Sequence, residues 1–74
     1  MPGCSLSAKQ RTIIELIHDG FRDGEIAERL GTSRHSAKRD LHAIYDLLGL
    51  WNRLELALWY EARRDPVTGN VQWP

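Results

Sequence analysis

The sequence has few of the residues that cross-link or stiffen small proteins. Its 74 residues include a single cysteine, Cys4, and three prolines. One cysteine excludes an internal disulfide and a cysteine-rich zinc site, and it fits a reducing compartment, so we expect a cytoplasmic protein in which Cys4 is a bystander thiol. At this length the chain holds at most one compact domain, with little room for a deep active site.

Long hydrophobic runs are also missing. No apolar stretch approaches the ~20 residues that cross a bilayer, and residues 1–5 lack the basic and then apolar layout of a signal peptide. We therefore expect a soluble protein that is not exported and has no membrane partner. The composition, 42% hydrophobic and 27% charged, is that of a globular protein.

The chain has no net charge, because ten Lys and Arg balance ten Asp and Glu. Net charge alone therefore predicts no nucleic-acid partner, but the charges are distributed unevenly. Residues 15–28 carry five carboxylates and one arginine, whereas residues 33–42 carry Arg34, Lys38 and Arg39 against Asp40. A basic stripe is therefore expected on a neutral protein.

Capping residues and apolar spacing predict four helices and no strands. Ser7 with Gln10, and Asn52 with Glu55, have the spacing of a capping box. Asp23 and Ser33 are residue types that cap helices, while glycines at 20, 31 and 49 mark helix ends. We predict an all-α domain over residues 1–64 with helices over about 8–19, 24–30, 34–48 and 53–64. Residues 65–74 form a short irregular tail, either a turn or a mobile segment.

The second and third predicted helices and the tight turn between them form a helix-turn-helix. In such a unit the second helix holds the third rigidly, so that the N-terminal half of the third can enter a DNA major groove. With Ala37, Leu41 and Ile44 facing inward, the polar face of residues 34–48 is free for duplex DNA. The predicted DNA-binding residues are Ser33, Arg34, His35, Ser36, Lys38, Arg39 and His42.

A plainer interpretation of this face is also open. Arg34, Lys38 and Arg39 would then form an ordinary solvated surface paired with Asp40 and Asp46. In the DNA-binding interpretation, Asp40 is expected to resist the close approach of phosphate.

The fourth predicted helix, 53–64, has apolar residues on two faces. We expect Leu54, Ala57 and Leu58 to face the core, and the opposite face to pair two copies of the chain. The predicted dimer-interface residues are Leu56, Trp59, Tyr60 and Arg63. In the alternative, Trp59 caps the core. The tail, with Val71 and Trp73, then covers the remaining apolar surface.

The sequence gives no support for catalysis. His35 and His42 are seven residues apart, about 10.5 Å along a helix, which is too far for one metal ion. No zinc-ligand spacing, serine nucleophile motif or glycine-rich phosphate loop is present. We expect no enzyme activity, no metal, no cofactor and no small-molecule substrate.

Landmarks over residues 6–60 resemble the DNA-binding domain of LuxR-type, or GerE-type, bacterial transcription regulators. The matching residues are Leu6-Ser7, Lys9-Gln10, Gly20, the run from Glu25 to Leu30, Ser33, Lys38, Leu41, Ile44, Leu48-Gly49, Asn52-Arg53 and Glu55. The resemblance implies a dimeric, sequence-specific transcription factor whose third helix reads the major groove and whose fourth helix pairs the subunits. It also implies that Lys38, Arg39 and His42 contact DNA.

Several positions depart from the pattern of that family. Asp23-Gly24 stand where the family usually has Asn-Lys, Asp40 replaces a usual histidine, and Leu47 replaces a frequent lysine. These changes are expected to lower the affinity for phosphate. An alternative function is therefore a protein-interaction module of the same fold, which captures another regulator through Trp51, Trp59 and Trp73 and binds DNA weakly or not at all.

Overall fold

The computed structural model describes residues 6–73 and contains four α-helices. They are α1 (Ala8–His18), α2 (Asp23–Leu30), α3 (Arg34–Leu48) and α4 (Arg53–Arg63). The predicted all-α class with four helices is confirmed. Helix α3 has the predicted bounds, and each of the others differs by one residue at one end. Cys4 lies outside the described residues.

Side-chain caps start three of the helices. The hydroxyl of Ser7 accepts a hydrogen bond from the Gln10 backbone N–H at 3.1 Å, and the Gln10 side chain accepts one from the Ser7 N–H at 2.8 Å. This is the reciprocal capping box that the spacing predicts. Ser33 and Asn52 each accept from the N–H three residues later, at 3.1 and 2.9 Å. These caps explain why three helix starts were predicted correctly.

The start of α2 differs from its prediction. Asp23 is the first helical residue rather than the cap, and Arg22 precedes the helix in an extended conformation. Glu25 supplies the capping interaction, because its carboxylate accepts from the Arg22 N–H at 2.9 Å. The helix ends as predicted at Gly31, whose φ of 68° is left-handed and favours glycine.

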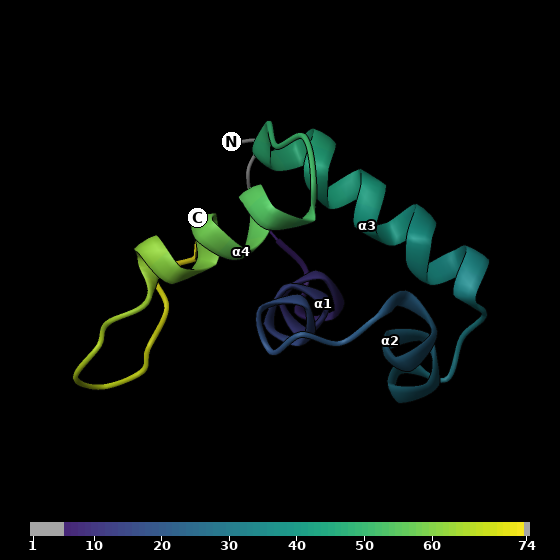
Figure 1. Ribbon diagram of the computed structural model, residues 1–74, viewed down its shortest axis with the longest axis horizontal. Coiled ribbons are helices and arrows are strands. Elements are labelled where there is room, and N and C mark those ends of the chain that lie inside the picture. The colour runs from purple at the N-terminus through teal and green to yellow at the C-terminus, as the bar shows by residue number, and fades with distance from the viewer. Residues whose placement is uncertain (1–5, 74) are drawn as a thin grey trace.

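A single apolar core lies around α1. In Figure 1, α1 is seen nearly end-on at the centre, with α3 and α4 above it and α2 at its side. Helix α1 packs against α4 and α3, while α2 packs against α3. Buried side chains come from all four helices and from the residue before the first cap: Leu6, Ile13, Ile14, Ile17, Ile26, Ala27, Ala37, Leu41, Ile44, Leu56 and Tyr60.

Four apolar residues of α4 lie on the opposite face to the one predicted for them. Leu56 is completely buried and Tyr60 is 7% exposed, although both were expected on the outer face. Conversely, Leu54 and Leu58 are 69% and 61% exposed, although both were expected in the core. Helix α1 packs on the side of α4 that carries Leu56 and Tyr60, so these two residues form part of the core and cannot also face a second copy.

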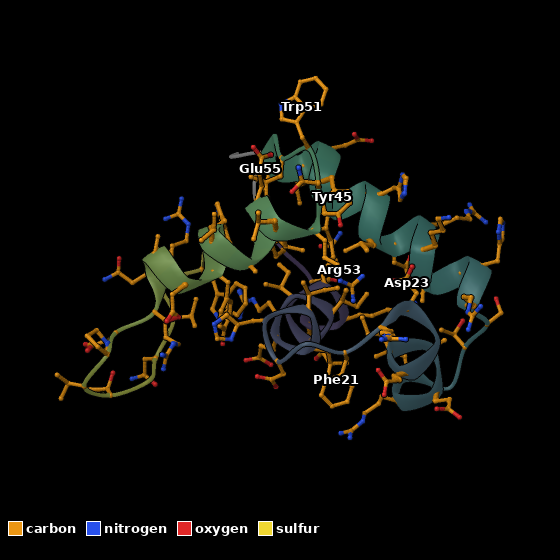
Figure 2. All side chains as sticks on the ribbon, viewed as in Figure 1. Phe21, Asp23, Tyr45, Trp51, Arg53 and Glu55 are labelled. Carbon is orange, nitrogen blue, oxygen red and sulfur yellow. The ribbon has the colours of Figure 1, made fainter. Side chains whose placement is uncertain are left out.

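Arg53, the first residue of α4, joins that helix to the start of α2. Its guanidinium donates to the Asp23 carboxylate at 2.9 Å and to the backbone carbonyl of Phe21. Figure 2 shows Arg53 extending from α4 into the middle of the molecule, with Tyr45 close by. Burial raises the pKa of the Tyr45 hydroxyl, and the positive charge of Arg53 opposes that rise.

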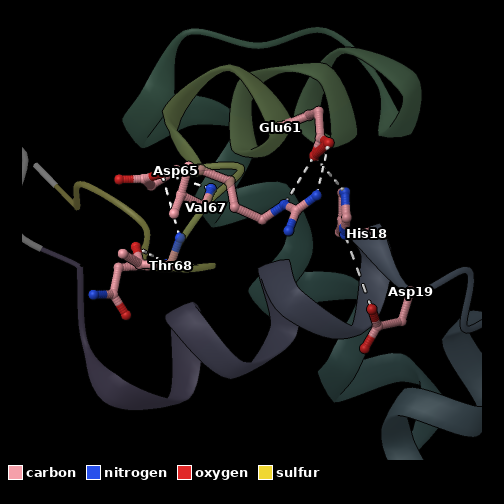
Figure 3. Close-up of polar contacts among 8 residues, drawn as sticks. His18, Asp19, Glu61, Asp65, Val67 and Thr68 are labelled. Atoms are coloured by element: carbon pink, nitrogen blue, oxygen red, sulfur yellow. Dashed lines mark hydrogen bonds and ion pairs between the residues drawn. The ribbon is translucent and has the colours of Figure 1, made fainter.

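The tail folds back as a turn. Arg64 and Val71 form an isolated antiparallel β-bridge, and the Asp65 N–H donates to the Asn70 carbonyl at 2.7 Å. The Asp65 carboxylate accepts from the N–H of Val67 at 2.8 Å, as Figure 3 shows. Of the two predicted possibilities for the tail, the structure therefore has the turn.

The end of the tail covers part of α4. The Trp73 ring lies 6.3 Å from that of Trp59 and 5.7 Å from that of Tyr60, measured between ring centroids. The Arg11 guanidinium lies 5.5 Å from the centre of the Trp73 ring. Trp59 is thus half-buried within its own chain, as in the alternative in which the tail covers this surface.

Candidate nucleic-acid interface

The outer face of α3 carries the predicted DNA-binding residues. Ala37, Leu41 and Ile44 are buried, so the rest of the N-terminal half of the helix faces solvent. Ser36 is half-buried, and the other six predicted residues are exposed: Ser33, Arg34, His35, Lys38, Arg39 and His42. The helix therefore presents this set together, as its spacing predicts.

Four of these side chains line one open depression along α3. They are His35, Lys38, Arg39 and His42, and Ala43 and Asp46 complete the lining. The His42 ring lies 5.8 Å from that of Tyr45, between centroids. Imidazole and cationic side chains in one row can donate hydrogen bonds to base edges and to phosphates.

The ten lysines and arginines all lie in residues 6–73 and divide by what their charged groups contact. Three form ion pairs: Lys9, Arg53 and Arg64. Three lie over aromatic rings: Arg11, Arg29 and Arg63. Within this part of the chain, the other four make neither kind of contact: Arg22, Arg34, Lys38 and Arg39. These four precede α2 or lie in the first six residues of α3, so the cations without such a contact gather around α2 and the start of α3.

Asp40 pairs with a residue outside this face. Its carboxylate lies 2.8 Å from the Lys9 amino group on α1. Neither Asp40 nor Asp46 forms an ion pair with Arg34, Lys38 or Arg39, so the pairing expected in the solvated-face interpretation is absent, although these three cations are exposed as that interpretation expects. The carboxylate that is expected to resist phosphate is therefore paired with a cation of α1.

Sequence reasoning missed Arg22 and the position of Arg34. Arg22 stands outside the predicted recognition helix, in a segment rich in carboxylates. In the structure both arginines line a depression with Gly24 at the start of α2. The signal available in the sequence was the glycine at position 24, which leaves room for a large neighbour.

Large apolar side chains are exposed on α4 and just before it. Trp51 is 86% exposed and extends away from the molecule in Figure 2. Trp51 and the exposed Leu54 and Leu58 together make up what we call the α4 patch. Arg63 and Trp59, which were predicted for the dimer interface, contact each other, with the guanidinium 4.6 Å from the ring centre.

Two further properties concern the described residues. Among residues 6–73, no group of three His, Asp or Glu side chains is placed to hold a metal ion. In the same segment, no helix combines the length and the hydropathy needed to cross a membrane.

Comparison with known proteins adds a sequence likeness. No protein-family model matches the chain. A stretch of 49 residues is 39% identical to the "Probable transcriptional regulatory protein SgaR" of Hyphomicrobium methylovorum. The likeness is to a transcriptional regulator. It covers 66% of this chain and 23% of SgaR, so the chain spans about a quarter of that relative's length.

Proposed function

We propose that this protein is a transcription regulator of the LuxR type, which binds duplex DNA by placing the N-terminal half of α3 in the major groove. The observation that carries this proposal is the grouping, around α2 and the start of α3, of the four cations that form neither an ion pair nor a ring contact. The likeness to SgaR supports the same function class. In this proposal the protein binds DNA and catalyses no reaction. It is located at the nucleoid when it is bound to DNA.

The residues of α3 divide between attraction and recognition. Lys38 and Arg39 attract the DNA backbone through counterion release, and they reach guanine edges where the docking angle allows. His35 and His42 offer hydrogen bonds to bases from the same depression. The Ser33 hydroxyl accepts from the Ser36 N–H at 3.1 Å, and its own proton remains available for a phosphate oxygen.

The test is a fluorescence-anisotropy titration with mixed-sequence duplex DNA at several salt concentrations. Wild type is expected to bind with a steep negative slope of log affinity against log salt. Lys38→Ala is expected to bind more weakly, with a slope shallower by about one unit. Arg29→Ala is the matched control, because it removes one arginine that lies over Phe21 instead of facing the groove. Absence of binding by wild type at low salt would exclude the proposal.

Pairing of two copies through the α4 patch belongs to the same proposal. Leu54 and Leu58 on α4, and Trp51 two residues before the helix, are large apolar side chains exposed to solvent. Such surfaces mark interfaces, and a second copy offers a matching apolar helix. A dimer would also present two recognition helices to two half-sites.

Sedimentation equilibrium at high micromolar concentration tests the dimer. Wild type is expected to have the mass of two chains, and Leu58→Glu the mass of one. Val67→Glu is the control, since it adds the same charge at a 90% exposed apolar residue in the tail. A monomeric wild type would refute the pairing. If Lys38→Ala also left DNA binding unchanged, the protein-interaction module would be the better function.

A further inference from the structure

The Arg34 side chain lies against the backbone of α2. A Cβ atom built on Gly24 would stand 2.8 Å from the Nη2 atom of Arg34 and 3.4 Å from its Nε atom. Gly24 is not among the residues with positive φ, so no backbone conformation requires glycine there. Glycine within a helix is unfavourable relative to alanine. The absence of a Cβ atom at Gly24 therefore matters for packing, since it lets the Arg34 guanidinium lie directly against α2.

Cationic side chains outnumber carboxylates around this point. Arg22, Arg34, Lys38 and Arg53 line one depression together with Asp23 and Gly24. The only carboxylate in that lining, on Asp23, is paired with Arg53 at 2.9 Å. The nearby Glu25 carboxylate accepts from the Arg22 backbone N–H and serves the start of α2. Glu25 and Glu28 line a depression with Arg22, Gly24 and Arg34 as well. Arg22, Arg34 and Lys38 nevertheless form no ion pair within residues 6–73.

We propose that this depression, the Gly24 seat, binds one backbone phosphate of duplex DNA, with Arg34 as the main ligand. This inference rests on the proposed function and assigns a role within it. The planar guanidinium can donate two parallel hydrogen bonds to a phosphate, which a single ammonium group cannot do. Arg22 and Lys38 line the same depression and add positive charge to it.

Arg34 is consequently a positioning residue and not a base reader. A phosphate contact fixes the register and orientation of a protein on the duplex and carries no sequence information. Arg34 is the first residue of α3, and its guanidinium rests against the first turn of α2. A phosphate held there would fix both helices of the helix-turn-helix relative to the groove, while residues farther along α3 contact bases.

Position 24 allows a test that leaves every charge in place. In Gly24→Ala the new methyl group would stand 2.8 Å from the Nη2 atom of Arg34, so the flexible Arg34 side chain must shift from its place against the helix. The helix itself is expected to tolerate alanine well. Thermal unfolding of Gly24→Ala should therefore match or exceed that of wild type, while its DNA affinity should fall.

The experiment compares wild type, Arg34→Ala, Gly24→Ala and the double variant on a panel of unrelated duplexes at several salt concentrations. Arg34→Ala is expected to weaken binding by a similar factor on every duplex and to make the salt slope shallower by about one unit. Gly24→Ala should weaken binding in the same uniform way. In the Arg34→Ala background, Gly24→Ala should have no further effect, because its target is already gone. Arg29→Ala is again the control for lost charge.

Several outcomes would overturn the seat. Wild-type affinity in Gly24→Ala would show that the arginine does not act from this place. An Arg34→Ala variant that loses affinity on some duplexes and not on others would make Arg34 a base reader. If Lys38→Ala weakens binding while Arg34→Ala and Gly24→Ala do not, the proposed function is supported and phosphate binding at the Gly24 seat is excluded. If wild type binds no duplex, both fall.

Discussion

Asp40 lies on α3 between the cations of the proposed DNA face and the α1 helix. Its carboxylate and the Lys9 amino group are 2.8 Å apart, and their side chains are 35% and 52% exposed. An ion pair with that much solvent contact stabilises a fold by less than about 1 kcal/mol. Its larger effect is on the local field, because it cancels a negative charge beside α3.

Removal of Lys9 should therefore affect binding more than folding. We expect Lys9→Gln to change the free energy of unfolding by less than about 1 kcal/mol. We expect its DNA affinity to fall, because the uncompensated Asp40 repels phosphate. Lys9→Gln combined with Asp40→Asn should recover much of the lost affinity. Urea unfolding and anisotropy titration measure the two effects, and an unrecovered double variant would mean that Lys9 itself contacts DNA.

At the scale of elements, α4 shows where sequence patterns stop being decisive. Caps and glycines located the helices closely, because each acts on the backbone within a few residues. Both apolar sets of α4 have helical spacing, so the period alone could not select the buried one. Which set is buried depends on the side of α4 that α1 contacts and on the contact of Trp73, in the tail, with Trp59. Both contacts join residues that are far apart in the sequence. The α3 face was predictable because its buried stripe has no apolar competitor.

The two leucines of α4 provide a direct test of this assignment. Leu56→Ala removes a completely buried side chain and should lower the free energy of unfolding by about 2–5 kcal/mol. That is a large part of the roughly 5–15 kcal/mol that stabilises a typical domain. Leu58→Ala should change it by less than about 0.5 kcal/mol at a concentration where the chain is monomeric. Similar losses for the two variants would contradict the faces described above.

The tail should respond to acid through two carboxyl groups. The hydrogen bond from Arg64, with help from His18, lowers the pKa of Glu61 below its ordinary 4.5. The backbone N–H groups of Val67 and Thr68 lower the pKa of Asp65 below its ordinary 3.8. A lowered folded-state pKa means that the stabilisation is complete above the ordinary value and is lost as pH falls through the folded value.

We therefore expect the turn to loosen in acid, below the ordinary pKa values of these two groups. Release of Trp73 from Trp59 should shift tryptophan emission to the red, whereas Trp51 is already exposed and should contribute little change. Asp65→Asn should make this shift smaller, because its side chain no longer titrates. Asp46→Asn, on the exposed part of α3, is the control. An equal shift in wild type and Asp65→Asn would exclude a role for Asp65.

At the scale of the whole molecule, the helices pack as two pairs. Helix α4 packs on α1, α2 packs on α3, and contacts between α1 and α3 join the pairs. Arg53 adds a second connection, since it reaches from the first residue of α4 to Asp23 and to the Phe21 carbonyl. The Arg53 side chain therefore holds the start of α2, where the Gly24 seat lies. In the sequence, Arg53 is three residues before Leu56 in the core and next to Leu54 in the α4 patch.

Loss of this connection should loosen α2 selectively. Arg53→Ala removes hydrogen bonds made by a charged group in a partly exposed site, and we expect it to lower the free energy of unfolding by about 1–2 kcal/mol. The substitution should increase the hydrogen-exchange rate of the α2 amides more than that of the α1 amides, because α1 keeps its core contacts with α3 and α4. Arg53→Lys should fall between wild type and Arg53→Ala, since lysine keeps the charge for Asp23 but lacks the fork that also reaches Phe21. Uniformly faster exchange in all four helices would instead place Arg53 in the general stability of the fold, with no special hold on α2.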